Sequence, residues 1–285
     1  MIVIARLTVK ELVRRRVVWV LAILTLVSVA LVGWGLDRIV TLAREGGAEP
    51  FEIEVGVSQV LILIAFMFSF VLAVTAAFVG APAIGGDLES GVAYAILARP
   101  IRRADLLLGR WLGSAVVVAA YAAASGFLAI AVAAVVSGGY WPPDPPLAVA
   151  FLVGEALVLL TLTLALGSVL PSIAAGAIAV VGFGLAWMAG VMAGVGAALG
   201  VAALAPIAEA SRWLLPTDGL WRGVIYGLEP SLVALIAAGG SAKNLANANP
   251  FYATTPPPLP FVIWSIVWMA LVLGAATWWF DRRDL

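Results

Sequence analysis

The stretch VSQVLILIAFMFSFVLAVTAAFVGAPAI, residues 57–84, contains no charged side chain. An α-helix rises about 1.5 Å per residue and the hydrocarbon core of a membrane is about 30 Å thick, so roughly 20 apolar residues can cross it. The stretch therefore predicts a transmembrane helix. The composition agrees, because 64% of the chain is hydrophobic and 11% is charged, with a mean hydropathy of +1.11. A soluble domain carries about 25% charged residues.

Five other stretches are long and apolar enough to cross a membrane. The sequence therefore predicts an all-α integral membrane protein that forms one transmembrane domain over 1–285. The six spans are expected at 17–36, 57–84, 112–136, 147–170, 173–200 and 261–280. The connection 201–260 is expected to hold short helices at the membrane interface, with Trp213, Trp221 and Tyr226 at headgroup level.

The distribution of Lys and Arg predicts which side each connection faces. If both termini are cytoplasmic, eleven of the 16 basic side chains lie inside and five outside. An excess of Lys and Arg is typical of the cytoplasmic side. We therefore expect both termini and the connection 85–111 in the cytoplasm, and 201–260 on the opposite side. A seventh span within 201–260 is disfavoured, because it would contain Arg222, Glu229 and Pro230.

The first sixteen residues, MIVIARLTVKELVRRR, form a basic segment. At helical periodicity an apolar stripe lies beside a stripe of Arg6, Lys10 and Arg14, as in helices that rest on anionic headgroups. The apolar stripe consists of Ile2, Ala5, Val9, Leu12 and Val13. Two interpretations remain open: a structured amphipathic helix on the cytoplasmic surface, or a basic flank that only fixes the orientation of the first span.

The residue types exclude several kinds of chemistry. The chain has no histidine and no cysteine, which removes the commonest general base, the thiolate nucleophile and the commonest metal ligands. The nucleotide-binding pattern GxxxxGK[ST] is absent, and the net charge of zero gives no indication of a nucleic-acid partner. We therefore expect no catalytic residues, no metal and no cofactor bound by this chain.

Glu155, in the stretch AFLVGEALVLL, is the one ionisable residue expected inside a span. A carboxylate there costs on the order of 2.5–3.5 kcal/mol on insertion scales, so such residues often mark a substrate or proton site. The alternative is a packing role, in which a neutral Glu155 bonds a hydroxyl such as Thr161 or Ser125.

The stretch that follows residues 57–84, GGDLESGVAYAILARPIRRADLLLGRWLG (residues 85–113), contains acidic and basic residues around a short apolar run. Gly85 and Gly86 are expected to interrupt the preceding helix. Asp87 would then cap a new short helix, with Glu89 near its positive end. That helix would stop before Pro100, because the residue before a proline avoids the α region. The pattern predicts a short helix across the cytoplasmic mouth, although plain flanking charge would also place basic residues here.

This stretch resembles a characteristic element of ABC-2 type transporter permeases, in its order of acid, Gly, short apolar helix, ARPIRR, acid and LLLGRWLG. The segments ARLTVKELVRRR and FDRRDL are similar to the ends of such permeases. The resemblance implies a six-span subunit with a separately encoded ATPase, and a coupling helix between spans 2 and 3 that docks on it. Val92 departs from the pattern, since many relatives have Thr there. By position, the residues that would contact the ATPase are Asp87, Glu89, Ser90, Arg99, Pro100, Arg102 and Arg103.

The resemblance implies a permease subunit of an ATP-driven exporter in a prokaryotic cytoplasmic membrane, surrounded by lipid. It would pair with an identical or paralogous permease, and ATP with Mg²⁺ would bind the ATPase. Two alternatives belong to other classes. One is an ion-coupled secondary carrier that uses Glu155, and the other is a non-transporting subunit that drives maturation of an extracytoplasmic partner. The substrate stays open.

Overall fold

The computed structural model describes residues 1–14, 16–92, 102–229, 251–253 and 255–283. Within these ranges the chain is helical and contains no strand. Six helices in them are long and apolar enough to cross a membrane, which confirms the prediction of an all-α chain with six spans. They are α2 (Arg16–Glu45), α3 (Pro50–Glu89), α5 (Arg103–Ser137), α6 (Pro145–Gly167), α7 (Ser172–Ala198) and α12 (Leu259–Arg282). The shorter helices in these ranges are α1 (Ile2–Arg14), α8 (Ala205–Leu214), α9 (Thr217–Leu228) and a 3-10 helix, η1 (Ala202–Leu204).

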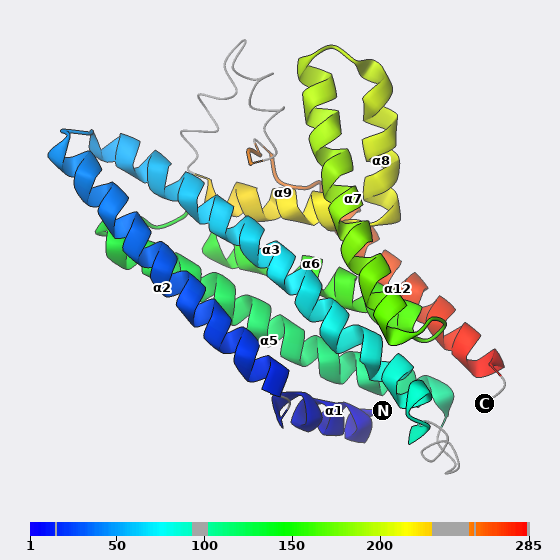
Figure 1. Cartoon of the computed structure of the whole chain (residues 1–285). Helices are drawn as coiled ribbons and strands as arrows, with labels where there is room; N and C mark the ends of the chain where they lie inside the picture. The colour runs from blue at the N-terminus through cyan, green and yellow to red at the C-terminus, as the bar shows by residue number, and fades with distance from the viewer. Residues whose placement is uncertain (15, 93–101, 230–250, 254, 284–285) are drawn as a thin grey trace.

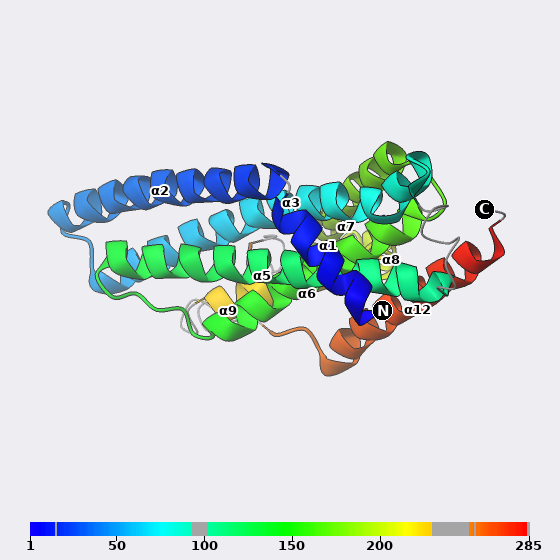
Figure 2. The same cartoon turned by 90° about the horizontal axis from the view of Figure 1, so that it is seen from below.

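Helix α3 occupies the centre of the bundle (Figures 1 and 2). It packs along α5, α6 and α7, while α2 lies against α3 and α5, and α12 lies against α5 and α6. The 40 residues of α3 span about 60 Å at 1.5 Å per residue, roughly twice the thickness of the hydrocarbon core. The helix therefore extends beyond the membrane or crosses it at a steep tilt.

The predicted interruption at Gly85 and Gly86 is wrong, because α3 continues through both glycines to Glu89. Tertiary packing explains why glycine is there. A Cβ at Gly85 would lie 2.7 Å from the Ser172 hydroxyl and 3.1 Å from the Gly167 carbonyl oxygen, so glycine lets α3 approach the corner between α6 and α7. The helix ends instead before Gly91, whose φ of +76° is the left-handed conformation that commonly ends helices.

The amino-terminal segment is a helix, α1, which crosses α5 (Figure 2). Ala5, Thr8 and Leu12 are buried, whereas Ile2 and Val13 are exposed. Glycines in α5 permit the contact, because a Cβ at Gly113 would lie 2.5 Å from the Ala5 carbonyl oxygen. The predicted apolar stripe is therefore divided between a face that packs on the protein and an exposed remainder.

Helix α9 lies against α6 in the interior, so the prediction of an interfacial position for Trp221 is wrong. Trp221 is 2% exposed, and its ring meets Phe66 of α3 at a centroid distance of 5.7 Å. Gly223 of α9 leaves room for the ring of Phe151 in α6. Trp213 is 44% exposed and Tyr226 is half-buried.

Substitution of Gly113 by Ala tests the close approach of α1 and α5. The added methyl group meets backbone and Thr8 atoms at 2.5–2.6 Å, so we expect destabilisation of about 1–3 kcal/mol, typical of overpacking. Thermal unfolding of the purified protein in detergent measures the effect. The matched control is Gly274→Ala in α12, where no atom lies within 4 Å of the new Cβ. There the higher helix propensity of Ala should raise the free energy of unfolding by up to about 1 kcal/mol. Equal responses of the two variants would contradict the close approach.

Candidate functional site: the charged end of the bundle

The two chain termini, the end of α3, the start of α5 and the corner between α6 and α7 gather at one end of the bundle (Figure 1). The amino group of Met1 lies 3.7 Å from the Asp105 carboxylate in the first turn of α5. In the sequence, residues 93–101 connect the end of α3 to the start of α5. We call this region the charged end, defined by Glu11, Asp87, Glu89, Arg103, Arg110 and Arg283.

Arg110 joins three helices at the charged end. Its guanidinium group donates to Glu11 of α1 and to Asp87 of α3, each at 2.6 Å, and its side chain is 12% exposed. A guanidinium presents several donors in a fixed plane, so it can hold two carboxylates at once. Asp87 therefore does not cap a new short helix as predicted. It lies within the last turns of α3 and fixes that helix to α5.

Glu89 connects α3 to the helix after the corner. Its carboxylate accepts a hydrogen bond of 2.7 Å from the backbone N–H of Ser172, the first residue of α7. A carboxylate at a helix N-terminus is favourable, because the unpaired N–H groups and the helix dipole are positive there. The dipole effect expected for Glu89 is present, but it acts on α7 and not on a new helix that begins at Asp87. The Ser90 hydroxyl donates to the Gly86 carbonyl at 2.6 Å and closes the end of α3.

Arg103 holds the end of α12. Its Nη1 donates to the backbone carbonyls of Phe280, Asp281 and Arg283 at 3.2, 3.1 and 2.5 Å. Arg283 in turn donates to the Ser168 carbonyl at 2.8 Å, next to the α6–α7 corner. Arginines near a helix C-terminus satisfy carbonyls that have no partner within the helix. Arg103 therefore has a structural role in this chain.

The predicted contact residues thus separate into three groups. Asp87, Glu89, Ser90 and Arg103 bond other parts of this chain. Arg102 is exposed at the start of α5. Arg99 and Pro100 lie outside the described residues, as does the part of the predicted coupling helix after Val92. Arg110 was not among the contact residues predicted from the sequence, although its position seven residues after Arg103 places it two helical turns further along the same helix.

Glu155 lies away from the charged end, in the middle of α6. It is 2% exposed, and its Oε2 accepts a hydrogen bond of 2.7 Å from the Ser69 hydroxyl of α3. A hydroxyl partner for Glu155 is therefore present, as expected, but it is Ser69 and neither of the two residues suggested from the sequence. Thr161 donates to the Leu157 carbonyl and Ser125 to the Ala122 carbonyl, each within its own helix.

The charged end bonds together the helices on either side of the connection 93–101. In the sequence this connection lies between α3 and α5. Helix α3 is fixed to α5 and α1 through the Asp87–Arg110–Glu11 ion pairs and to α7 by Glu89, and α5 is fixed to α12 by Arg103. A force applied to this connection would act on both of its flanking helices and on the helices bonded to them.

The long apolar helices define a multi-pass membrane protein. The chain belongs to a transporter family: the model described as ABC-2 family transporter protein matches residues 2–285. A search of curated proteins found no match to the chain.

Replacing Arg110 with Gln tests the junction of α1, α3 and α5. The change leaves Asp87 and Glu11 without the cation that they share, and removal of one member of a partly buried ion pair is costly. We expect α1 to open more often, so that trypsin cleaves at Arg6, Lys10 and Arg14 about tenfold faster or more.

The control for the trypsin experiment is Arg38→Gln, which removes an exposed charge from α2 and leaves α1 untouched. Cleavage at α1 is compared with cleavage elsewhere in the same chain, which separates local opening from general unfolding. An unchanged rate at α1 in the Arg110 variant would contradict the junction.

Glu229, directly after α9, gives a pH-dependent prediction. The side chain is 3% exposed, and burial raises the pKa of its carboxyl to about 7, although a hydrogen bond from the Ala253 N–H opposes the shift. The folded protein therefore favours the protonated form. The contribution of Glu229 to stability is therefore fully present below about pH 4.5 and is lost as the pH rises through about 7, where the buried carboxyl ionises.

Thermal unfolding of the wild type and of Glu229→Gln between pH 4.5 and 8 measures this effect. The neutral amide cannot ionise, so the variant should gain stability relative to the wild type as the pH rises through that window and keep the gain above it. A difference that does not change with pH would contradict the burial of an ionisable carboxyl.

Proposed function

We propose that this protein is the membrane-spanning permease subunit of an ATP-driven ABC exporter, whose ATP and Mg²⁺ are bound and hydrolysed by a separate ATPase chain. The observation that carries the proposal is the match of the ABC-2 transporter family to residues 2–285. The ion pairs and hydrogen bonds of α3 and α5, the helices that flank residues 93–101 in the sequence, support a coupling contact in this part of the chain. Under this proposal, the permease chain itself has no catalytic residue and binds no cofactor.

The proposed orientation places the charged end in the cytoplasm of a prokaryotic cell, with the chain in the cytoplasmic membrane. The termini lie at the same end of the bundle, as an even number of spans requires (Figure 1). Eleven of the 16 Lys and Arg residues then face the cytoplasm, in keeping with the usual bias.

In the proposed mechanism, the ATPase pushes on residues 93–101 when it binds ATP and closes. The long helices α3 and α5 carry the movement into the membrane, while Arg110 and Arg103 transfer it to α1 and α12. A second permease, identical or paralogous, completes the path, and a second ATPase lies beneath it. ATP drives the change because the ATPase makes different contacts with the inward-open and outward-open states.

The contacts of Glu155 support a packing role over that of an ion-coupling site. Its carboxylate is buried between α6 and α3 and accepts from Ser69. A hydrogen bond to a neighbouring helix is the usual way to accommodate a polar group in the membrane. The secondary-carrier alternative consequently has less support than coupling to an ATPase.

The test is co-purification of the ATPase with the tagged full chain in mild detergent. We expect Arg99→Ala combined with Arg102→Ala to reduce the recovered ATPase at least tenfold. Arg103 is left unchanged, because it holds the end of α12 and its loss would disturb the fold. The control is Arg6→Ala combined with Lys10→Ala, which removes two exposed charges from the same end of the bundle and should retain the ATPase.

The amount of each variant in the membrane fraction is measured first, so that failed insertion is not mistaken for lost binding. Equal recovery of the ATPase from the wild type and the Arg99/Arg102 variant would overturn the assigned coupling contact. Absence of any ATPase from the wild-type preparation in several mild detergents would overturn the proposed function itself.

A further inference from the structure

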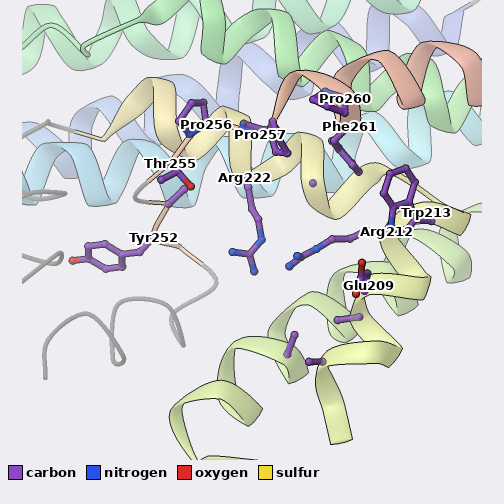
Figure 3. A pocket seen from close by; sticks show the side chains of 16 residues that line it. Glu209, Arg212, Trp213, Arg222, Tyr252, Thr255, Pro256, Pro257, Pro260 and Phe261 are labelled. Atoms are coloured by element: carbon purple, nitrogen blue, oxygen red, sulfur yellow. The ribbon is translucent and has the colours of Figure 1, made fainter. Parts of the chain in front are cut away.

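A cavity of about 590 Å³ lies where α8, α9 and the start of α12 meet (Figure 3). It is far from the charged end, because α12 begins at the cavity and finishes beside Arg103. Binding sites for small ligands typically have volumes of about 300–1,000 Å³. One wall is formed by Pro256, Pro257, Pro258 and Pro260, and Trp213 and Phe261 also line the cavity.

Two arginines from different helices point into this cavity. Figure 3 shows the guanidinium groups of Arg212 from α8 and Arg222 from α9 directed toward each other. Arg212 donates from Nε to the Asp218 carboxylate at 2.7 Å, and the Nε of Arg222 lies 3.6 Å from the same oxygen. Two cations therefore share one carboxylate.

The Asp218 carboxylate compensates Arg212 better than Arg222. The Nε of Arg222 is buried and has no hydrogen-bond acceptor among the residues that the structure describes. Burial holds the pKa of Arg222 below its usual value, Asp218 opposes that shift and the neighbouring Arg212 adds to it. Glu209 also lines the cavity, but it is exposed and forms no ion pair in the described part of the chain.

Asp218 is fixed in place by the helix behind it. Its side chain is 5% exposed, and a Cβ at Gly190 of α7 would overlap its carboxylate. In this position the carboxylate bonds Arg212 at 2.7 Å and remains 3.6 Å from the Nε of Arg222. An additional anion between the two guanidinium groups would complete the compensation, and guanidinium pairs suit phosphate oxygens because of their planar, multiple donors.

The remaining walls suit an apolar body. Proline has no backbone N–H, so the wall of four prolines offers no donors from those residues. Trp213 and Phe261 pack edge to face with a centroid distance of 6.4 Å. Beside the cavity, α8 exposes Ile207 and Leu214, and the exposed Trp213 belongs to the same helix. Exposed apolar and Trp side chains are typical of helices at the membrane interface, where lipid headgroups are within reach.

We propose that this cavity binds an amphiphilic phosphate, with the phosphate between Arg212 and Arg222 and the apolar part against Trp213, Phe261 and the proline wall. An anionic phospholipid headgroup is the favoured source, and a soluble organic phosphate offers the same chemistry. Asp218 is a positioning residue that holds Arg212. The site rests on contacts within this chain and does not depend on an ATPase partner.

The experiment uses the purified, delipidated full chain in detergent. It is titrated with phosphatidylglycerol, with zwitterionic phosphatidylcholine and with glycerol 3-phosphate, and native mass spectrometry and thermal unfolding measure binding. We expect one phosphatidylglycerol to bind at least tenfold more tightly than phosphatidylcholine, with a rise in unfolding temperature. Tight binding of glycerol 3-phosphate as well would assign the site to phosphate chemistry from either source.

The variant Arg222→Gln should lose at least tenfold in affinity for phosphatidylglycerol. If Arg222→Gln is unstable, Arg222→Lys replaces it in the test because it keeps the positive charge. Arg222→Lys should also lose affinity, because lysine lacks the planar pair of donors of a guanidinium group. The control Arg282→Gln removes an exposed charge at the far end of α12 and should bind as the wild type does. Unchanged affinity in both Arg222 variants, or a wild type that does not prefer either anion to phosphatidylcholine, would overturn the proposal.

Discussion

The ion pairs of Arg110 are the interaction on which the arrangement of the charged end depends. One guanidinium holds carboxylates of α1 and α3 while it belongs to α5 itself. Three helices that are separate in sequence are thereby fixed at one point. Because the side chain is 12% exposed, water screens these pairs less than it would screen pairs on an open surface.

Because α3 is continuous, the Arg110 junction is connected rigidly to the part of α3 that packs in the bundle. The helix passes through Gly85 and Gly86 without interruption, so Asp87 and Glu89 are on the same rigid element as the residues that pack in the membrane. A break at the glycines would have isolated these carboxylates on a separate lever. The structure instead makes Asp87 and Glu89 part of the last turns of the span itself.

Hydropathy predicted the six spans, because length and apolar composition are local properties that a membrane-crossing helix requires. The predictions were wrong where tertiary contacts determine whether a helix continues or whether a side chain is buried. Gly85 favours a break in an isolated helix, but here it admits Ser172 and Gly167. Trp221 has the amphipathic ring of an interfacial residue, but glycines in α9 allow that helix to pack against α6 and bury it.

The same limit applies to the candidate site. The stretch 85–113 identified the region of the chain that contains the site, and its acidic residues Asp87 and Glu89 were among the predicted contacts. Their partners were not predictable, because Glu89 bonds Ser172 across 83 positions and Arg103 bonds carbonyls about 180 positions away. Arg212, Asp218 and Arg222 form a cluster only through the fold of α8 and α9.

Two helices contact both the charged end and the cavity. Helix α7 begins at Ser172, which Glu89 caps, and carries Gly190 against Asp218. Helix α12 begins with Phe261 packed on Gly219 and ends with its last carbonyls on Arg103. Helices resist bending, so a tilt of either one that starts at the charged end displaces a wall of the cavity. Occupation of the cavity by an anion would resist the same tilt, because its two guanidinium groups belong to α8 and α9, which pack on α7. Such a link is reciprocal. If the tilt lowers the affinity of the cavity for its ligand, the bound ligand disfavours the tilt by the same free energy.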